Sequence, residues 1–260
     1  MNRALRSIGL AGAFVLGFAG ATSAQTSKPF RALFIGNSYT YYNDLPMVIA
    51  DLATDAKASR RFEPHVVLVG GSTLEAHLAR KTALDEIARG NWDAVIIQDQ
   101  STRPITDPRA TMRDVATFAN ATSKVGAKLI VYETWAREAT PQTQDSLTRV
   151  LHAAAAAVGA SVVHAGEAWR AFREQEEVPA GAHSLLFAPD GSHPSPLGTH
   201  LAASAFYATL YGKSPVGLPT TSRPTSTQPP PGPAPDVKRE PVDAKLGKVA
   251  QELAWKAARP

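Results

Sequence analysis

Short apolar runs alternate with longer amphipathic stretches between residues 30 and 212, and this alternation restricts the possible folds strongly. The runs are four or five residues long, rich in Val, Ile and Leu, and nearly continuous in hydrophobicity. Strands that are buried on both faces of a parallel sheet have this pattern. The predicted strands are Arg31–Ile35, His65–Val69, Ala94–Ile97, Leu129–Tyr132 and Ser161–His164.

The stretches between the predicted strands have the spacing of helices. Residues 45–52 carry apolar side chains at positions i, i+3, i+4 and i+7. The last helix begins well, because Ser195 is a good N-cap and Pro196 suits the first helical position. Alternating strands and helices predict an α/β fold, a three-layer α/β/α sandwich around a mainly parallel five-stranded sheet. Further helices are expected over residues 74–87, 109–124, 144–158 and 196–211.

Composition divides the chain into four segments. Residues 1–24 have the features of a signal peptide, and residues 25–213 carry the α/β pattern. Residues 214–241 hold nine of the 20 prolines and are interpreted as an extended linker. Residues 242–260 contain one short amphipathic helix, which is too short to be stable alone and is expected to dock on the domain.

The predicted signal peptide decides where the protein is expected to act. Arg3 and Arg6 precede a short apolar run, and small residues at 21–24 suit cleavage near Ala24. The run is shorter than the roughly 20 residues that span a membrane. We therefore expect a secreted or periplasmic protein without a stable membrane span, and an uncleaved anchor is the alternative.

Composition excludes several classes of function. The chain has no cysteine, which rules out disulfides, a cysteine nucleophile and thiolate metal sites. A balance of 27 basic and 23 acidic residues gives no reason to expect a nucleic-acid partner. No histidine pair has a recognisable metal-binding spacing, so neither a metal nor a cofactor is expected. Four histidines are interpreted as satisfied or surface side chains: His65, His152, His164 and His200.

Polar and glycine-rich segments follow several predicted strands, and one more precedes the last helix. Ligands bind at the carboxyl ends of the strands in an open parallel sheet, so these segments are expected to converge. Ser38 is a candidate nucleophile, His193 its base and Asp190 the carboxylate that orients the imidazole. The N–H groups of Ser38 and Gly71 are candidate oxyanion donors, although a tight turn alone also explains the glycine. Further pocket or supporting candidates are Asn37, Gln98, Tyr41, His77 and Trp135.

These segments resemble three sequence blocks of the SGNH hydrolase superfamily, the GDSL-like esterases and lipases. The blocks are Gly36-Asn37-Ser38, Gly71-Ser72-Thr73 and Asp190-x-x-His193-Pro194, and the resemblance covers about residues 30–212. It implies a flavodoxin-like three-layer fold and a Ser–His–Asp esterase that needs no metal. One block departs, because Gln100 stands where the family has an Asn that donates to the oxyanion, and Gln98 is the competing donor.

The expected function is therefore that of an exported serine esterase acting on O-acyl esters. The expected partner is a small-molecule or polysaccharide ester, and acetyl esters of carbohydrate suit an exported enzyme. Three alternatives remain open: an acyltransferase on the same site, a lipid or lysophospholipid esterase, and a catalytically inactive binding protein with the same fold. The oligomeric state is not predicted.

Overall fold

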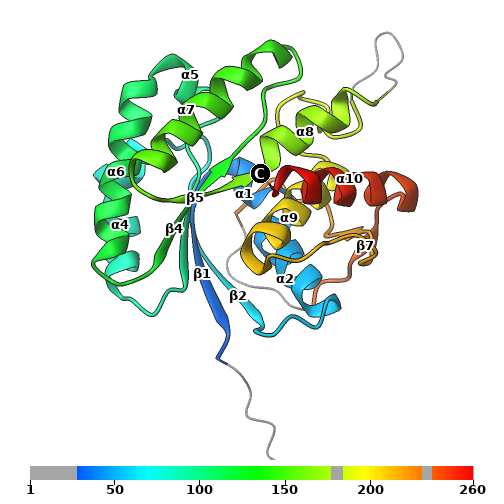
Figure 1. The fold of residues 1–260 in the computed structure, drawn as a ribbon, viewed down its shortest axis with the longest axis horizontal. Coiled ribbons are helices and arrows are strands. Elements are labelled where there is room, and N and C mark those ends of the chain that lie inside the picture. Colours follow the sequence, from blue (N-terminus) through cyan, green and yellow to red (C-terminus); the bar gives the residue numbers. More distant parts are fainter. Residues whose placement is uncertain (1–27, 177–183, 230–235, 260) are drawn as a thin grey trace, which may run out of the picture.

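Five parallel strands form the central sheet of the computed structural model, which describes residues 28–176, 184–229 and 236–259. Their order is β2-β1-β3-β4-β5, a doubly wound arrangement (Figure 1). The predicted α/β sandwich with a five-stranded parallel sheet is confirmed. The strands are β1 (Phe30–Gly36), β2 (Phe62–Leu68), β3 (Ala94–Ile97), β4 (Lys128–Glu133) and β5 (Ser161–His164).

Helices cover both faces of this sheet (Figure 1). One face carries α3 (Leu74–Arg80), α4 (Thr82–Ala88), α6 (Pro108–Ser123) and α7 (Gln144–Ala157). The other face carries α2 (Leu45–Asp55), α8 (Ala165–Arg173), α9 (Pro196–Tyr211) and α10 (Ala244–Ala257). The remaining short elements are α1 (Ser38–Tyr41), η1 (Tyr42–Asp44), α5 (Arg103–Thr106), η2 (Pro141–Thr143), β6 (Thr221–Ser222) and β7 (Glu240–Pro241).

The nearly continuous hydrophobicity of the strands follows from burial on both sides. Along β1, Ala32 and Phe34 belong to the core under α2 and α9, whereas Leu33 and Ile35 belong to the core under α3 and α6. Successive strand residues point to opposite faces, so a sheet with two cores needs apolar residues at every position. All four side chains are at most 1% exposed.

Two helical features differ from the sequence expectation. Residues 74–87 form two helices, because Lys81 adopts a left-handed conformation with φ of 64° and ends α3. Helix α8 was not predicted at all. It follows β5 without an intervening turn, so no turn residue in the sequence indicates where it begins. It buries Trp169 and Phe172 against the sheet.

Part of the proline-rich segment packs on the domain. Arg223 is only 1% exposed, and its guanidinium donates to both carboxylate oxygens of Asp51 on α2, at 3.0 and 3.1 Å. The short strand β6, directly before Arg223, pairs antiparallel with β7. Helix α10 then packs against α8 and α9. The described part of residues 214–241 is therefore more than a spacer, because it contributes buried contacts to α2.

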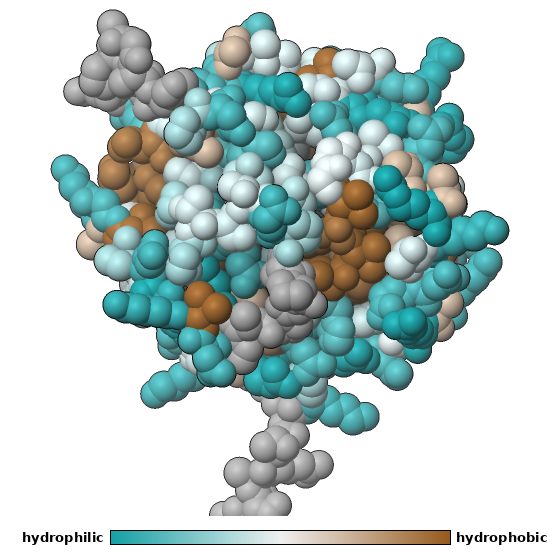
Figure 2. All heavy atoms as spheres, turned by 180° about the vertical axis from the view of Figure 1, so that it is seen from behind, coloured by the Kyte–Doolittle hydropathy of each residue, from teal (hydrophilic) through white to brown (hydrophobic). Residues whose placement is uncertain are grey.

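The described surface gives no sign of a membrane span. Among the residues that the structure describes, no helix is both long enough and apolar enough to cross a bilayer. The face drawn in Figure 2 is mostly hydrophilic, with apolar side chains gathered in a few separate patches. The predicted signal peptide, residues 1–24, lies outside the described residues.

Candidate active site

Ser38 lies at the junction between β1 and α1, where the central sheet presents its carboxyl edge. β1 ends at Gly36, and Asn37 is the N-cap of α1, accepting a hydrogen bond from the Tyr39 N–H at 3.1 Å through Oδ1. The turn is fixed from a second direction, because the Asn37 side chain donates to the Ser72 carbonyl at 2.9 Å. Ser38 is 9% exposed. Its hydroxyl therefore stands on a turn held by hydrogen bonds and is only slightly exposed.

A continuous chain of hydrogen bonds joins Ser38, His193 and Asp190. The Ser38 Oγ lies 2.8 Å from His193 Nε2, and His193 Nδ1 lies 2.5 Å from Asp190 Oδ2. The N–H groups of Ser192 and His193 donate to Asp190 Oδ1, each at 2.9 Å. A carboxylate can only accept, so Nδ1 carries the ring proton and Nε2 is free to accept the hydroxyl proton. This is the tautomer that a base for serine needs.

Asp190 is held in its charged form. Partial burial raises its pKa, but hydrogen bonds from the His193 ring and from the N–H groups of His193 and Ser192 outweigh it, so its pKa lies below the usual value. A carboxylate that stays ionised at neutral pH can stabilise an imidazolium beside it.

Aromatic side chains fix the loop that carries His193. The Tyr42 ring stacks on the His193 ring with 4.0 Å between centroids. The Tyr39 hydroxyl hydrogen-bonds to Ser192 Oγ at 2.8 Å, and Trp135 Nε1 donates to the Ser192 carbonyl at 3.0 Å. Trp135 is fully buried, so it supports the loop from below and does not line the cavity.

A cavity of about 340 Å³ opens above Ser38. Among its lining residues are six predicted site residues: Asn37, Ser38, Tyr41, Gly71, Gln100 and His193. Gly71 has a φ of 65°, which explains the glycine by backbone conformation. Arg137, which is not among the predicted site residues, lines the cavity as well. Arg137 lies in a polar stretch without a motif, so its position after β4 was the one sequence feature that placed it at the carboxyl edge of the sheet.

The two glutamines that competed for one role have different surroundings. Gln98 is 1% exposed and accepts from the Asn37 N–H at 2.9 Å and the Thr40 hydroxyl at 3.0 Å, while its Nε2 donates to Asn37 Oδ1 at 3.0 Å. Gln100 accepts two N–H bonds through Oε1, and within the described part of the chain its Nε2 has only a long contact of 3.4 Å to Ser101 Oγ. The Gln100 amide is thus freer to bind a ligand than the Gln98 amide.

His77 supports the turn from beneath. It is 1% exposed, and its Nε2 lies 2.8 Å from the Gly36 carbonyl. Burial lowers the pKa of His77, so the ring is neutral at neutral pH and donates this hydrogen bond from Nε2. The contact holds the end of β1 and lies behind the cavity.

Comparison with solved structures finds the same architecture in several hydrolases. A protein from Slackia heliotrinireducens, assigned to the SGNH hydrolases, is 31% identical to this chain, with 70% of this chain and 99% of that chain covered and a TM-score of 0.58. A DUF4886 family protein from Bacteroides uniformis is 18% identical, covering 88% and 94%, with a TM-score of 0.66. The acetylxylan esterase Axe2 from Geobacillus stearothermophilus is 19% identical, covering 70% and 94%, with a TM-score of 0.53.

The last two similarities, at under 25% identity, concern the fold alone. No protein-family model and no curated protein matches the chain. The protein from Slackia heliotrinireducens is 31% identical to this chain, and the match covers nearly all of that protein. With the fold described above, this similarity shows that the chain belongs to the SGNH hydrolase superfamily.

Proposed function

We propose that this protein is an exported serine esterase that cleaves O-acyl esters with Ser38, His193 and Asp190 as its catalytic triad. The unbroken hydrogen-bond chain from the Ser38 hydroxyl to the Asp190 carboxylate carries this proposal. The proposal of export rests on the signal-like composition of residues 1–24.

The proposed reaction has two halves. Ser38 Oγ attacks the acyl carbon while His193 Nε2 takes its proton, and the Asp190 carboxylate stabilises the imidazolium. His193 then gives the proton to the leaving alcohol as the carbon–oxygen bond breaks, which leaves an acyl-enzyme. A water molecule, deprotonated by His193, attacks the acyl carbon next. The carboxylic acid leaves and Ser38 regains its proton.

The negative charge on the attacked carbonyl oxygen needs donors in both halves. We assign this role to the backbone N–H groups of Ser38 and Gly71 and to the Nε2 of Gln100. The weakly engaged Gln100 amide in the cavity lining supports this choice over Gln98, whose amide is committed to Asn37. Gln98 and His77 act by holding the turn that carries Ser38.

Short acyl esters of a carbohydrate fit the cavity best. The cavity is small, and tyrosine hydroxyls, amides and the Arg137 guanidinium give its wall hydrogen-bonding groups that suit a sugar. An acetylxylan esterase among the structural neighbours supports the same substrate class.

One observation favours a second candidate, an esterase for longer acyl chains. A cavity of about 390 Å³ adjoins the site at Tyr42 and Asp190 and has a largely apolar wall that includes Phe187, Pro189 and Pro194. An acyl chain that passed Tyr42 would find apolar contacts there.

Comparing esters on the wild type and Ser38→Ala tests the proposed activity and separates the two substrate classes. For the wild type we expect kcat/KM on acetylated sugars and p-nitrophenyl acetate to exceed that on p-nitrophenyl octanoate by at least about tenfold. The reverse order would favour the long-chain esterase. Ser38→Ala should lower kcat/KM by about 1,000-fold or more with an unchanged Tm.

Ser204→Ala is the matched control, because Ser204 is a fully buried serine on α9 whose hydroxyl has no hydrogen-bond partner among the residues that the structure describes. It should keep wild-type activity. If Ser38→Ala retained most of its activity while folded, the proposed mechanism would be wrong.

A further inference from the structure

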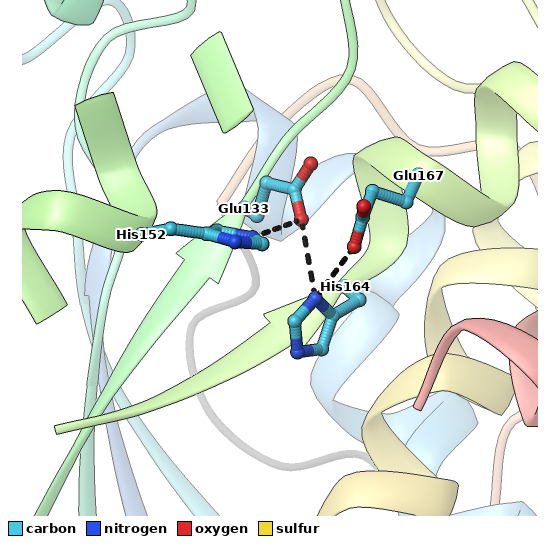
Figure 3. A group of neighbouring side chains, drawn as sticks. All are labelled: Glu133, His152, His164 and Glu167. Atoms are coloured by element: carbon cyan, nitrogen blue, oxygen red, sulfur yellow. Dashed lines mark hydrogen bonds and ion pairs between the residues drawn. The ribbon is translucent and has the colours of Figure 1, made fainter. Parts of the chain in front are cut away.

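A second cluster of histidines and carboxylates lies at the carboxyl ends of β4 and β5, away from Ser38. Glu133 ends β4, His164 ends β5, His152 comes from α7 and Glu167 from α8 (Figure 3). One possible ligand atom from each residue lies within 4.8 Å of the others. From sequence, His152 and His164 are expected to be satisfied or surface side chains, and the fold brings them together.

The spacing of these atoms matches the coordination shell of a small divalent ion. The Glu133 Oε2 lies 3.1 Å from His152 Nε2 and 3.7 Å from His164 Nδ1. The Glu167 Oε2 lies 2.7 Å from His164 Nδ1. Around a tetrahedral zinc ion with bonds of about 2.0–2.2 Å, ligand atoms are about 3.3–3.6 Å apart. Each of these three contacts differs from that separation by less than 1 Å, and the remaining pairs, all within 4.8 Å, must reach the same range for coordination.

Neighbouring side chains already orient the central carboxylate. Glu133 is fully buried, and its Oε1 accepts hydrogen bonds from the Thr148 hydroxyl at 2.7 Å and from the Gln144 amide at 3.2 Å. These bonds leave Oε2 to face the two imidazoles, and Figure 3 draws its contacts with both. Outer hydrogen bonds of this kind fix the ligands of metal sites.

The cluster is open to ions from one side. A cavity of about 430 Å³ is lined by His152, His164 and Glu167 and reaches α10. Lys256 and Arg259 also line this cavity, and their charges oppose a cation. Attraction must therefore come from the two carboxylates at the centre, which makes each of them necessary for tight binding.

We propose that Glu133, His152, His164 and Glu167 bind one divalent transition-metal ion, with Zn²⁺ as the best fit. Two imidazoles and two carboxylates suit zinc, whereas Mg²⁺ and Ca²⁺ prefer oxygen ligands alone. The ion ties β4, α7, β5 and α8 together, and its role is structural. It is separate from the proposed triad and takes no part in ester hydrolysis.

Zinc titration of the untagged full chain, first stripped with a chelator, tests the site. Calorimetry should show one saturable Zn²⁺ per chain. At about 100 times Kd, Tm should rise by roughly 5–10 °C. Co²⁺ should bind at the same place and give the intense visible absorption of a tetrahedral complex.

Three variants distinguish this site from adventitious binding. His164→Ala and Glu167→Gln should each weaken Zn²⁺ binding by about 100-fold or more while the metal-free proteins keep their fold by circular dichroism. Glu167 is part-exposed, so its substitution is the milder of the two. The control is His65→Ala, because His65 also pairs with a glutamate, Glu63 at 3.2 Å, outside the cluster. It should bind Zn²⁺ as the wild type does.

The proposal is overturned if no 1:1 binding is found, if binding survives both His164→Ala and Glu167→Gln, or if His65→Ala loses it equally. Ester hydrolysis should not change when zinc is removed, so failure here leaves the proposed triad untouched.

Discussion

The proposed triad and the cluster around Glu133 use the same chemical groups at the same edge of the sheet, but they connect them differently. In the triad, His193 has a carboxylate at Nδ1 and a hydroxyl at Nε2. In the cluster, the His152 and His164 rings both contact Glu133 Oε2. An imidazole between a carboxylate and a hydroxyl is arranged to move a proton, whereas two imidazoles on one oxygen are arranged to surround an ion.

Exposure distinguishes the carboxylates that the histidines contact in the two regions. The Asp190 side chain is 46% exposed, so it is near solvent and substrate. The Glu133 side chain is 0% exposed and has hydrogen bonds from two neutral side chains besides its histidine contacts. The other three cluster side chains are 26–32% exposed, so an ion can reach the cluster while its central carboxylate stays shielded from solvent.

Replacing one histidine in each region should give the largest difference. His193→Ala removes the base and should lower kcat/KM for p-nitrophenyl acetate by about 1,000-fold or more. His152→Ala should change it by less than about threefold, because His152 belongs to the other cluster. Steady-state kinetics at pH 7 measure both. Equal losses in the two variants would mean that the regions are not functionally separate.

Replacing one carboxylate in each region should give smaller effects, on kcat in one variant and on stability in the other. Asp190→Asn should lower kcat by at least about 100-fold, with little change in Tm because the side chain is half exposed. Glu133→Gln should leave kcat within about threefold but cost about 1–3 kcal/mol of unfolding free energy, because its partners lose a buried carboxylate. Kinetics and denaturant unfolding measure the two effects. A loss of stability in Asp190→Asn together with a loss of kcat in Glu133→Gln would refute the division of roles.

The stability that Asp190 contributes should fall as the pH is lowered. Its pKa is lowered in the folded protein, so any stability that the His193 pair adds is present above the unfolded value near 4 and lost as the pH falls through the lowered one. The small Tm difference between wild type and Asp190→Asn should therefore shrink in acid.

The sequence allowed the first region to be predicted and concealed the second. Asp190 and His193 lie in one loop, and Ser38 follows a strand, so a short motif and a parallel-sheet pattern suffice to suggest their meeting. Glu133, His152, His164 and Glu167 come from four elements, and no motif joins them. The buried contact of Arg223 with Asp51 spans most of the chain in the same way. Local patterns predict elements and loops, whereas such contacts depend on tertiary packing.

Activation of Ser38 by His193 is tested most directly by covalent labelling. A fluorophosphonate probe reacts with a serine whose hydroxyl is deprotonated by a neighbouring base. The folded wild-type protein should take up one equivalent, and peptide mass spectrometry should locate it on Ser38, while His193→Ala should label at least about 100 times more slowly. A folded protein that stays unlabelled, or a label on another serine, would contradict the proposed triad.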